Sequence, residues 1–219
     1  MAIRAILFDL DGTLLDTLAD IARSANEALE IQGFPTHPEA DYLRFIGDGV
    51  AMLLHRALPP DRSGEAEVGR CVASFQETYG RGWNVRTRLY DGIGPLLDGL
   101  VGRGILLAVL SNKPDDFTRR FGETYLAPWP FRAVVGHRAG SPRKPDPSSA
   151  LEIAEGLGVE PSECAFVGDS VVDIETALAA GMTPIGVSWG FQPVEALREA
   201  GAEAILDEPE KLLDRLGPG

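Results

Sequence analysis

The stretch "AIRAILFDLDGT", residues 2–13, places two carboxylates directly after an apolar segment. Its first part, up to Phe8, has the composition of a buried strand, and the acids Asp9 and Asp11 follow at once. Burying a carboxylate is costly unless a cation or a chemical task makes use of the charge. The stretch therefore predicts a strand whose carboxyl end carries acids that serve a ligand or a reaction.

The rest of the chain repeats short apolar runs that alternate with helical stretches. Further strand-like runs are expected at residues 105–111, 132–136, 164–168, 184–188 and 203–206. Between the later runs lie helical stretches such as 147–158 and 172–181, the second closed by Gly181 as a C-terminal cap. Strand and helix alternating in this way predict an α/β fold, with a mainly parallel sheet covered by helices on both faces.

Residues 16–86 interrupt this alternation with three helical stretches separated by turns. A connection between two neighbouring strands normally needs far fewer residues. We therefore expect a discontinuous α/β core made of residues 1–15 and 87–219, and an inserted helical domain at residues 16–86.

Composition narrows the class of protein. The chain has 219 residues, 44% of them hydrophobic, and a formal net charge of −13, which argues against nucleic acid or an anionic membrane as a partner. An anionic substrate would need a local cationic site. The apolar runs are too short to cross a bilayer, we expect no signal peptide, and the two cysteines form no disulfide framework. A reducing, cytoplasmic location is the simplest expectation.

Polar residues follow several of the expected strands, where ligands bind in an open α/β sheet. They are Asp9, Asp11, Ser111, Asn112, Lys144, Asp169 and Asp173. Taken singly, an acid or a serine here could be a turn or cap residue, and a lysine could be a solvated charge. Taken together, acids and a lysine at one sheet edge predict a site for a hard cation beside a site for an anion.

Four motifs carry a resemblance to a known family. They are "DLDGT" (9–13), "LSN" (110–112), the lysine of "RKPDP" (143–147) and "GDSVVD" (168–173). Their types and order resemble the haloacid dehalogenase superfamily, in the branch of phosphatases with a helical cap inserted after the first motif. The longer segments "SNKPDDF" and "FVGDSVVDIETALAAGM" are similar to phosphoglycolate phosphatases. The resemblance implies a Rossmann-like parallel sheet with an inserted α-helical cap domain.

The resemblance also implies a reaction. Asp9 would attack phosphorus and become an aspartyl phosphate. Asp11 would donate a proton to the leaving oxygen and then take one from water. The implied cofactor is Mg²⁺, which would cancel the repulsion between a phosphate dianion and an attacking carboxylate.

The same resemblance assigns the remaining motif residues to metal and phosphate. Mg²⁺ would be held by Asp9, the backbone carbonyl of Asp11 and Asp169, with Asp173 orienting metal-bound water. The transferring phosphoryl oxygens would be held by Ser111, by backbone N–H groups near Asn112 and by Lys144.

Other chemistries of the superfamily fit less well. Dehalogenation needs neither a proton donor nor the metal acids, and phosphonate cleavage needs a lysine in the cap, where this chain has none. We expect hydrolysis of a small phosphorylated metabolite, with 2-phosphoglycolate as the first candidate. A sugar phosphate or pyrophosphate is a rival substrate, and a phosphomutase or a catalytically silent binding module stays open. The oligomeric state is not predicted.

Substrate specificity is expected to come from the inserted domain, within residues 44–58. This segment reads "RFIGDGVAMLLHRAL", a glycine-rich loop followed by an amphipathic helix. Candidates to contact the substrate are Arg44, Asp48, His55 and Arg56. Most arginines on helix surfaces are solvated, so a purely structural role for each remains open.

Overall fold

The computed structural model describes residues 2–47 and 49–216. The chain divides into two compact units. One unit comprises Met1–Leu15 and Leu89–Gly219, and the other comprises Asp16–Arg88. Across the described ranges, every helix is too short or too polar to serve as a transmembrane segment.

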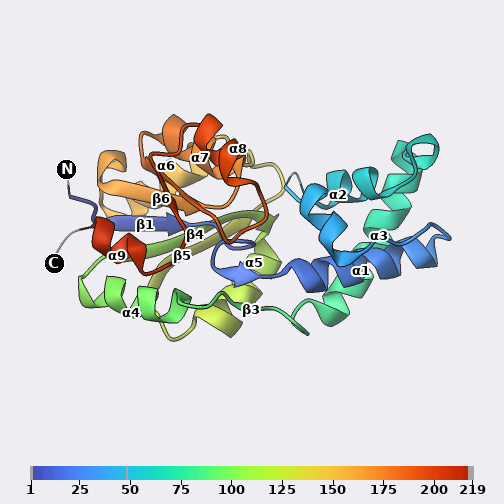
Figure 1. Cartoon of the computed structure of the whole chain (residues 1–219), viewed down its shortest axis with the longest axis horizontal. Helices are drawn as coiled ribbons and strands as arrows, with labels where there is room; N and C mark the ends of the chain where they lie inside the picture. The colour runs from blue at the N-terminus through green and yellow to red at the C-terminus, as the bar shows by residue number, and fades with distance from the viewer. Residues whose placement is uncertain (1, 48, 217–219) are drawn as a thin grey trace. The chain divides into compact units, whose positions relative to one another are not determined.

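The first unit is built on a six-stranded sheet (Figure 1). Its strands are β1 (Ala5–Phe8), β4 (Leu106–Pro114), β5 (Phe131–His137), β6 (Cys164–Gly168), β7 (Thr183–Val187) and β8 (Ala204–Leu206). They lie in the order β5-β4-β1-β6-β7-β8, and every neighbouring pair is parallel. Each apolar run of the sequence analysis overlaps one of these strands, so the predicted parallel sheet is confirmed.

Helices cover both faces of this sheet, as Figure 1 shows. Those on one face are α6 (Ser148–Leu157), α7 (Val171–Ala180) and α8 (Val194–Glu199). The other face carries α4 (Ile93–Gly102), α5 (Asp115–Phe121) and α9 (Lys211–Arg215). Right-handed crossovers require this division, because the chain moves from β1 toward β5 and then in the opposite direction from β6 to β8. A crevice for ligands is expected beyond the carboxyl ends of the central strands.

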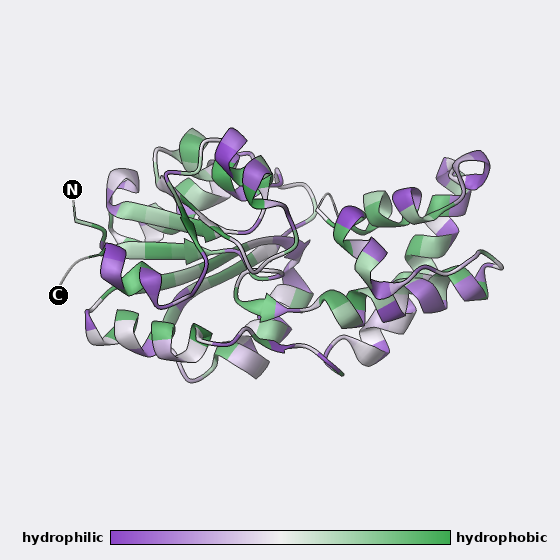
Figure 2. Ribbon diagram, in the orientation of Figure 1, coloured by the Kyte–Doolittle hydropathy of each residue, from purple (hydrophilic) through white to green (hydrophobic). Residues whose placement is uncertain are grey.

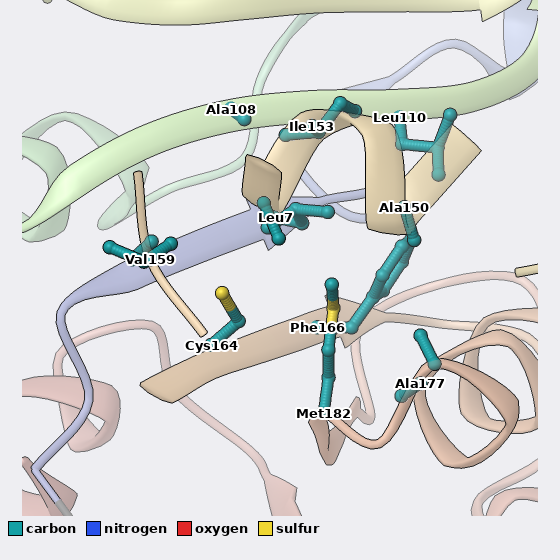
Figure 3. Packing of buried hydrophobic residues seen from close by; sticks show 13 residues of the cluster. Leu7, Ala108, Leu110, Ala150, Ile153, Val159, Cys164, Phe166, Ala177 and Met182 are labelled. Atoms are coloured by element: carbon teal, nitrogen blue, oxygen red, sulfur yellow. The ribbon is translucent and has the colours of Figure 1, made fainter. Parts of the chain in front are cut away.

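The core between the sheet and helices α6 and α7 consists of closely packed hydrophobic side chains (Figure 3). Leu7 and Phe166 reach it from the neighbouring strands β1 and β6, and Ile153 and Ala177 reach it from the helices. In Figure 2 these central strands are hydrophobic along their length, as strands buried on both faces must be. This core fixes the positions of the strand ends that carry the polar residues.

The second unit consists of helices. They are α1 (Leu18–Ile31), the 3₁₀ turn η1 (Glu39–Arg44), α2 (Val50–Ala57), the 3₁₀ turn η2 (Pro60–Arg62) and α3 (Glu65–Gly82). Helix α3 packs against both α1 and α2. Ile21, Ala25 and Leu29 repeat at helical spacing along α1 and are buried, so α1 is an amphipathic helix.

A buried acid ties together the two ends of the helical unit. The carboxylate of Asp20, near the start of α1, is fully buried. Its Oδ2 accepts hydrogen bonds from the backbone N–H of Arg86, the backbone N–H of Thr87 and the hydroxyl of Thr87, each at 2.8 Å. Asp20 lies near the start of the helical unit, and Arg86 and Thr87 lie near its end. These hydrogen bonds therefore hold the first and last segments of the unit side by side.

Candidate active site

Three buried carboxylates meet at the carboxyl ends of β1 and β6. Asp9 follows β1, Asp169 follows β6, and Asp173 lies in the first turn of α7. One oxygen from each lies within 4.8 Å of the others, and all three residues are buried. β1 and β6 are parallel neighbours, so their carboxyl ends coincide. The convergence expected from the sequence is present for these acids.

Asp169 is held from two sides. Its Oδ1 accepts a hydrogen bond from the hydroxyl of Thr13 at 3.0 Å, and its Oδ2 accepts one from the N–H of Phe191 at 2.8 Å. A Cβ atom added at Gly12 or at Gly190 would overlap this carboxylate. Gly12 also has a φ of +84°, which side chains rarely allow. The glycine of the first motif therefore serves the turn and makes room for the acid.

Lys144 supplies a buried positive charge to this cluster. Its Nζ donates to Oδ1 of Asp9 at 2.9 Å and to Oδ1 of Asp173 at 2.6 Å. Asn112 fixes the backbone of this lysine, because its Oδ1 accepts from the Lys144 N–H at 2.9 Å and its Nδ2 donates to the Lys144 carbonyl at 3.1 Å. From the sequence, Asn112 is expected near phosphate, but no local pattern signals its pairing with the backbone of Lys144.

Asp173 is fixed by the start of its own helix. Its Oδ2 accepts hydrogen bonds from the N–H of Ser170 at 3.0 Å and from the Ser170 hydroxyl at 2.6 Å. Ser170 is the N-cap of α7 and accepts in return from the N–H of Asp173. This reciprocal capping leaves the other oxygen of Asp173 directed at Lys144.

Burial dominates the electrostatics of the cluster. It raises the pKa of Asp9 to about 6, against the opposing charge of Lys144. Burial also raises the pKa of Asp169 well above its ordinary value, helped by the charges of Asp173 and Asp9. Burial alone would lower the pKa of Lys144, but Asp173 and Asp9 outweigh it and hold that pKa above its ordinary value. Lys144 therefore stays charged, but its single positive charge does not balance the negative charge of the carboxylates around it.

This donor set fits a hard divalent cation. The cluster offers carboxylate oxygens and contains no histidine or cysteine among the described residues, and oxygen donors are those that such ions prefer. The raised pKa values of Asp9 and Asp169 mean that these acids ionise less readily than they do in water, even with Lys144 beside them. A divalent cation would supply the missing positive charge.

The remaining motif residues lie beside the cluster, Ser111 on β4 and Asp11 in the turn that follows β1. Ser111 is buried near the end of β4, and its hydroxyl accepts a hydrogen bond from the N–H of Lys113 at 3.3 Å. The carboxylate of Asp11 accepts from Nζ of Lys113, at 3.0 Å for each oxygen. The sequence analysis gave Lys113 no role. The scarcity of lysine in the chain was the available signal, since Lys113 and Lys144 are two of only three.

Three of the specificity candidates of the helical unit, Arg44, His55 and Arg56, are exposed, and each of the three has a partner nearby. Arg44 pairs with Asp41 at 2.5 Å, and Arg56 donates to the carbonyl of Phe45 at 3.1 Å. His55 Nδ1 lies 3.1 Å from the carbonyl oxygen of Ser63. Asp48 lies outside the described residues. For all four, a role in substrate recognition stays a prediction.

Comparisons of this chain with known proteins, by sequence and by structure, agree on one family. The model of the haloacid dehalogenase-like hydrolase family matches residues 6–187. A phosphoglycolate phosphatase of Rhodospirillum rubrum is 34% identical, over 98% of this chain and 91% of its own. One from Haemophilus influenzae is 33% identical, over 97% and 98%. A crystal structure from Lactobacillus delbrueckii subsp. bulgaricus superposes with a TM-score of 0.93 at 32% identity, covering 100% of both chains.

Proposed function

The chain belongs to the haloacid dehalogenase-like hydrolase family and is a phosphatase, and we propose that it hydrolyses 2-phosphoglycolate with Mg²⁺ through an aspartyl phosphate. The observation that carries the mechanism is the pairing of Lys144 with Asp9 inside a buried cluster of acids. The proposed substrate rests on similarity to phosphoglycolate phosphatases over nearly the whole chain.

Asp9 is the proposed nucleophile. Its carboxylate oxygen attacks phosphorus, a new P–O bond forms, and the bond from phosphorus to the leaving oxygen breaks. Asp11 starts this step in its protonated form and gives that proton to the leaving oxygen, which departs as an alcohol. In the second half, the oxygen of a water molecule attacks the same phosphorus, the P–O bond to Asp9 breaks, and Asp11 takes a proton from that water. Phosphate then leaves, and Asp9 and Asp11 return to their starting states.

Other residues hold and orient the reacting groups. Lys144 fixes one oxygen of Asp9 and places a permanent positive charge beside the phosphoryl group. Ser111 and backbone N–H groups near Asn112 would donate to phosphoryl oxygens. Mg²⁺, held by Asp9, the Asp11 carbonyl and Asp169, would lower the repulsion between the nucleophile and the dianionic phosphate.

The helical unit is the proposed cap. Its residues would exclude water from the reacting atoms and limit which leaving groups can enter. In this proposal the α/β core carries out the phosphoryl transfer, a reaction that is the same for every phosphate monoester.

The test is phosphate release from a substrate panel. The panel contains 2-phosphoglycolate, several sugar phosphates and pyrophosphate, each assayed with Mg²⁺ and again with a chelator. We expect the highest kcat/KM for 2-phosphoglycolate and loss of release with the chelator. A higher kcat/KM for a sugar phosphate or for pyrophosphate than for 2-phosphoglycolate would overturn the substrate assignment. Full activity in the chelator would overturn the metal requirement.

A further inference from the structure

The distribution of lysine in this chain is uneven. Only three lysines occur in 219 residues. Lys144 and Lys113 lie at the candidate site with side chains 4% and 7% exposed, whereas the side chain of Lys211 is 47% exposed. Burying an ammonium group is unfavourable unless it has a charged partner or a task. Lys144 has its task in the cluster of acids, and Lys113 needs a separate explanation.

Lys113 is held firmly at the end of β4. Its Nζ lies 3.0 Å from both carboxylate oxygens of Asp11. The same atom lies 4.7 Å from the centroid of the buried Phe121 ring, in a cation–π contact. The aromatic ring and the carboxylate together fix the position of the charge. Little solvent screens it, so it acts strongly on any anion that comes near.

The two buried lysines serve different parts of the site. Lys144 contacts Asp9 and Asp173, the acids at the phosphoryl and metal positions. Lys113 contacts Asp11, the residue assigned to the leaving oxygen. Lys113 therefore lies on the side where the leaving group departs. A charge at this position acts on the leaving group, which is the part in which phosphate esters differ from one another.

Distances allow direct contact between Lys113 and a short leaving group. A proton donor works within about 2.6–3.2 Å of the oxygen that it protonates. Adding the 3.0 Å from Asp11 to Lys113 places Nζ within roughly 6 Å of that leaving oxygen. In 2-phosphoglycolate a single CH₂ separates this oxygen from the carboxylate, which extends roughly 3–4 Å from it at ordinary bond lengths of about 1.5 Å. Nζ and the carboxylate can thus meet within hydrogen-bond distance.

Given the phosphatase function proposed above, on which this step rests, we propose that Lys113 binds the carboxylate of the leaving group. The site then selects phosphate esters of short carboxylic acids. The net charge of −13 repels an anionic substrate, so such a substrate needs a local positive charge to bind. Lys113 supplies that charge. It places the specificity-determining charge in the α/β core, on a different unit from Arg44 and Arg56.

The experiment compares three two-carbon phosphate monoesters that differ in the charge at their far end. They are 2-phosphoglycolate (negative), ethyl phosphate (neutral) and O-phosphoethanolamine (positive). kcat/KM is measured for the wild type and for Lys113→Met, Lys113→Gln and Lys113→Arg. The control variant is Lys211→Met, a surface lysine, and Arg44→Met and Arg56→Met test the rival expectation that the helical unit recognises the substrate. Ratios between substrates come from one enzyme sample, so a partly misfolded variant still gives a valid ratio.

We expect wild type to prefer 2-phosphoglycolate to ethyl phosphate, and ethyl phosphate to O-phosphoethanolamine. In Lys113→Met and Lys113→Gln the first ratio should fall by about ten- to a hundredfold, the effect of one lost charge-assisted hydrogen bond. Lys113→Arg should keep most of the ratio, and the control variant Lys211→Met should keep all of it.

Two results would overturn the assignment of Lys113. One is an unchanged ratio in Lys113→Met, which would limit Lys113 to neutralising Asp11. The other is collapse of the ratio in Arg44→Met or Arg56→Met instead. A wild type without preference for 2-phosphoglycolate would overturn the proposed substrate itself, and the two failures are therefore distinguishable.

Discussion

Nζ of Lys144 lies 2.6 Å from Oδ1 of Asp173, although the two residues are 29 positions apart. Each arrives by a separate route, Asp173 in the first turn of α7 and Lys144 from the loop before α6. The same ammonium group also contacts Asp9, so one cation links the proposed nucleophile to the acid at the helix start. The charge balance of the whole cluster depends on this contact.

Lys144→Met should therefore destabilise the metal-free protein as well as abolish turnover. Breaking a buried ion pair by removing one partner costs about 3–5 kcal/mol, because the other charge stays buried. The measurement is urea denaturation in a chelator, and added Mg²⁺ should recover part of the loss. Lys211→Met is the control and should leave the unfolding midpoint unchanged. Equal midpoints for the two variants would contradict this account.

Asp9→Asn should abolish turnover and change how stability depends on pH. The folded-state pKa of Asp9 is raised to about 6, above its ordinary value of 3.8. Between those values the folded protein keeps a proton that the unfolded chain has lost, so the wild type loses stability as the pH rises through this window. An asparagine has no such proton.

The check on Asp9 is the melting temperature of both proteins in a chelator. The difference, variant minus wild type, should grow from about pH 4 to about pH 6 and then level off. A difference that stays constant with pH, or that shrinks as the pH rises, would show that Asp9 does not carry the raised pKa.

Asp169→Asn should remove the stabilisation that Mg²⁺ gives. A ligand that binds only the folded state stabilises it by about 2.7 kcal/mol at a hundred times its dissociation constant. For a chain of this size each kcal/mol raises the melting temperature by roughly 2–4 °C. We expect a clear rise with Mg²⁺ for the wild type and for Glu175→Gln, an exposed acid on the same helix as Asp173. An equal rise of the melting temperature in Asp169→Asn would show that Mg²⁺ binds at another site.

Asp20→Ala should loosen the ends of the helical unit. Removal of the carboxylate takes the acceptor from two backbone donors, the N–H groups of Arg86 and Thr87, while the Thr87 hydroxyl keeps the Trp83 carbonyl at 3.3 Å. Each buried donor left unpaired costs about 1–3 kcal/mol. Amide hydrogen exchange should accelerate at residues 86 and 87. Asp61→Ala, an exposed acid in the same unit, should leave exchange there unchanged. Slow exchange in both variants would show that Asp20 does not hold these segments.

The sheet was predictable because its signals are local. Each strand carries its own apolar run, and Gly181 ends α7 in the left-handed conformation that a C-terminal cap requires. The acids Asp9 and Asp169 were also predictable, since they directly follow neighbouring strands. In each case a periodic pattern or a position at a strand end carries the information.

The contacts between distant segments could not be predicted in this way. Asn112 binds the backbone of Lys144 across 32 positions, and Lys113 reaches Asp11 across 102. Asp20 is a third case, because its acceptor role depends on residues 66 and 67 positions away. These pairings follow from packing of the complete fold, and one sequence holds no periodic signal for them.

The covalent intermediate on Asp9 is the central claim, and Asp11→Asn tests it most directly. This variant cannot accept the proton from water, so the phosphoryl group should remain on Asp9. p-Nitrophenyl phosphate needs little help in leaving, so the first step should still proceed. We predict a burst of one equivalent of nitrophenol without matching phosphate release, and peptide mass spectrometry should find one phosphoryl group on Asp9. Nitrophenol and phosphate released together, with Asp9 unmodified, would contradict the account.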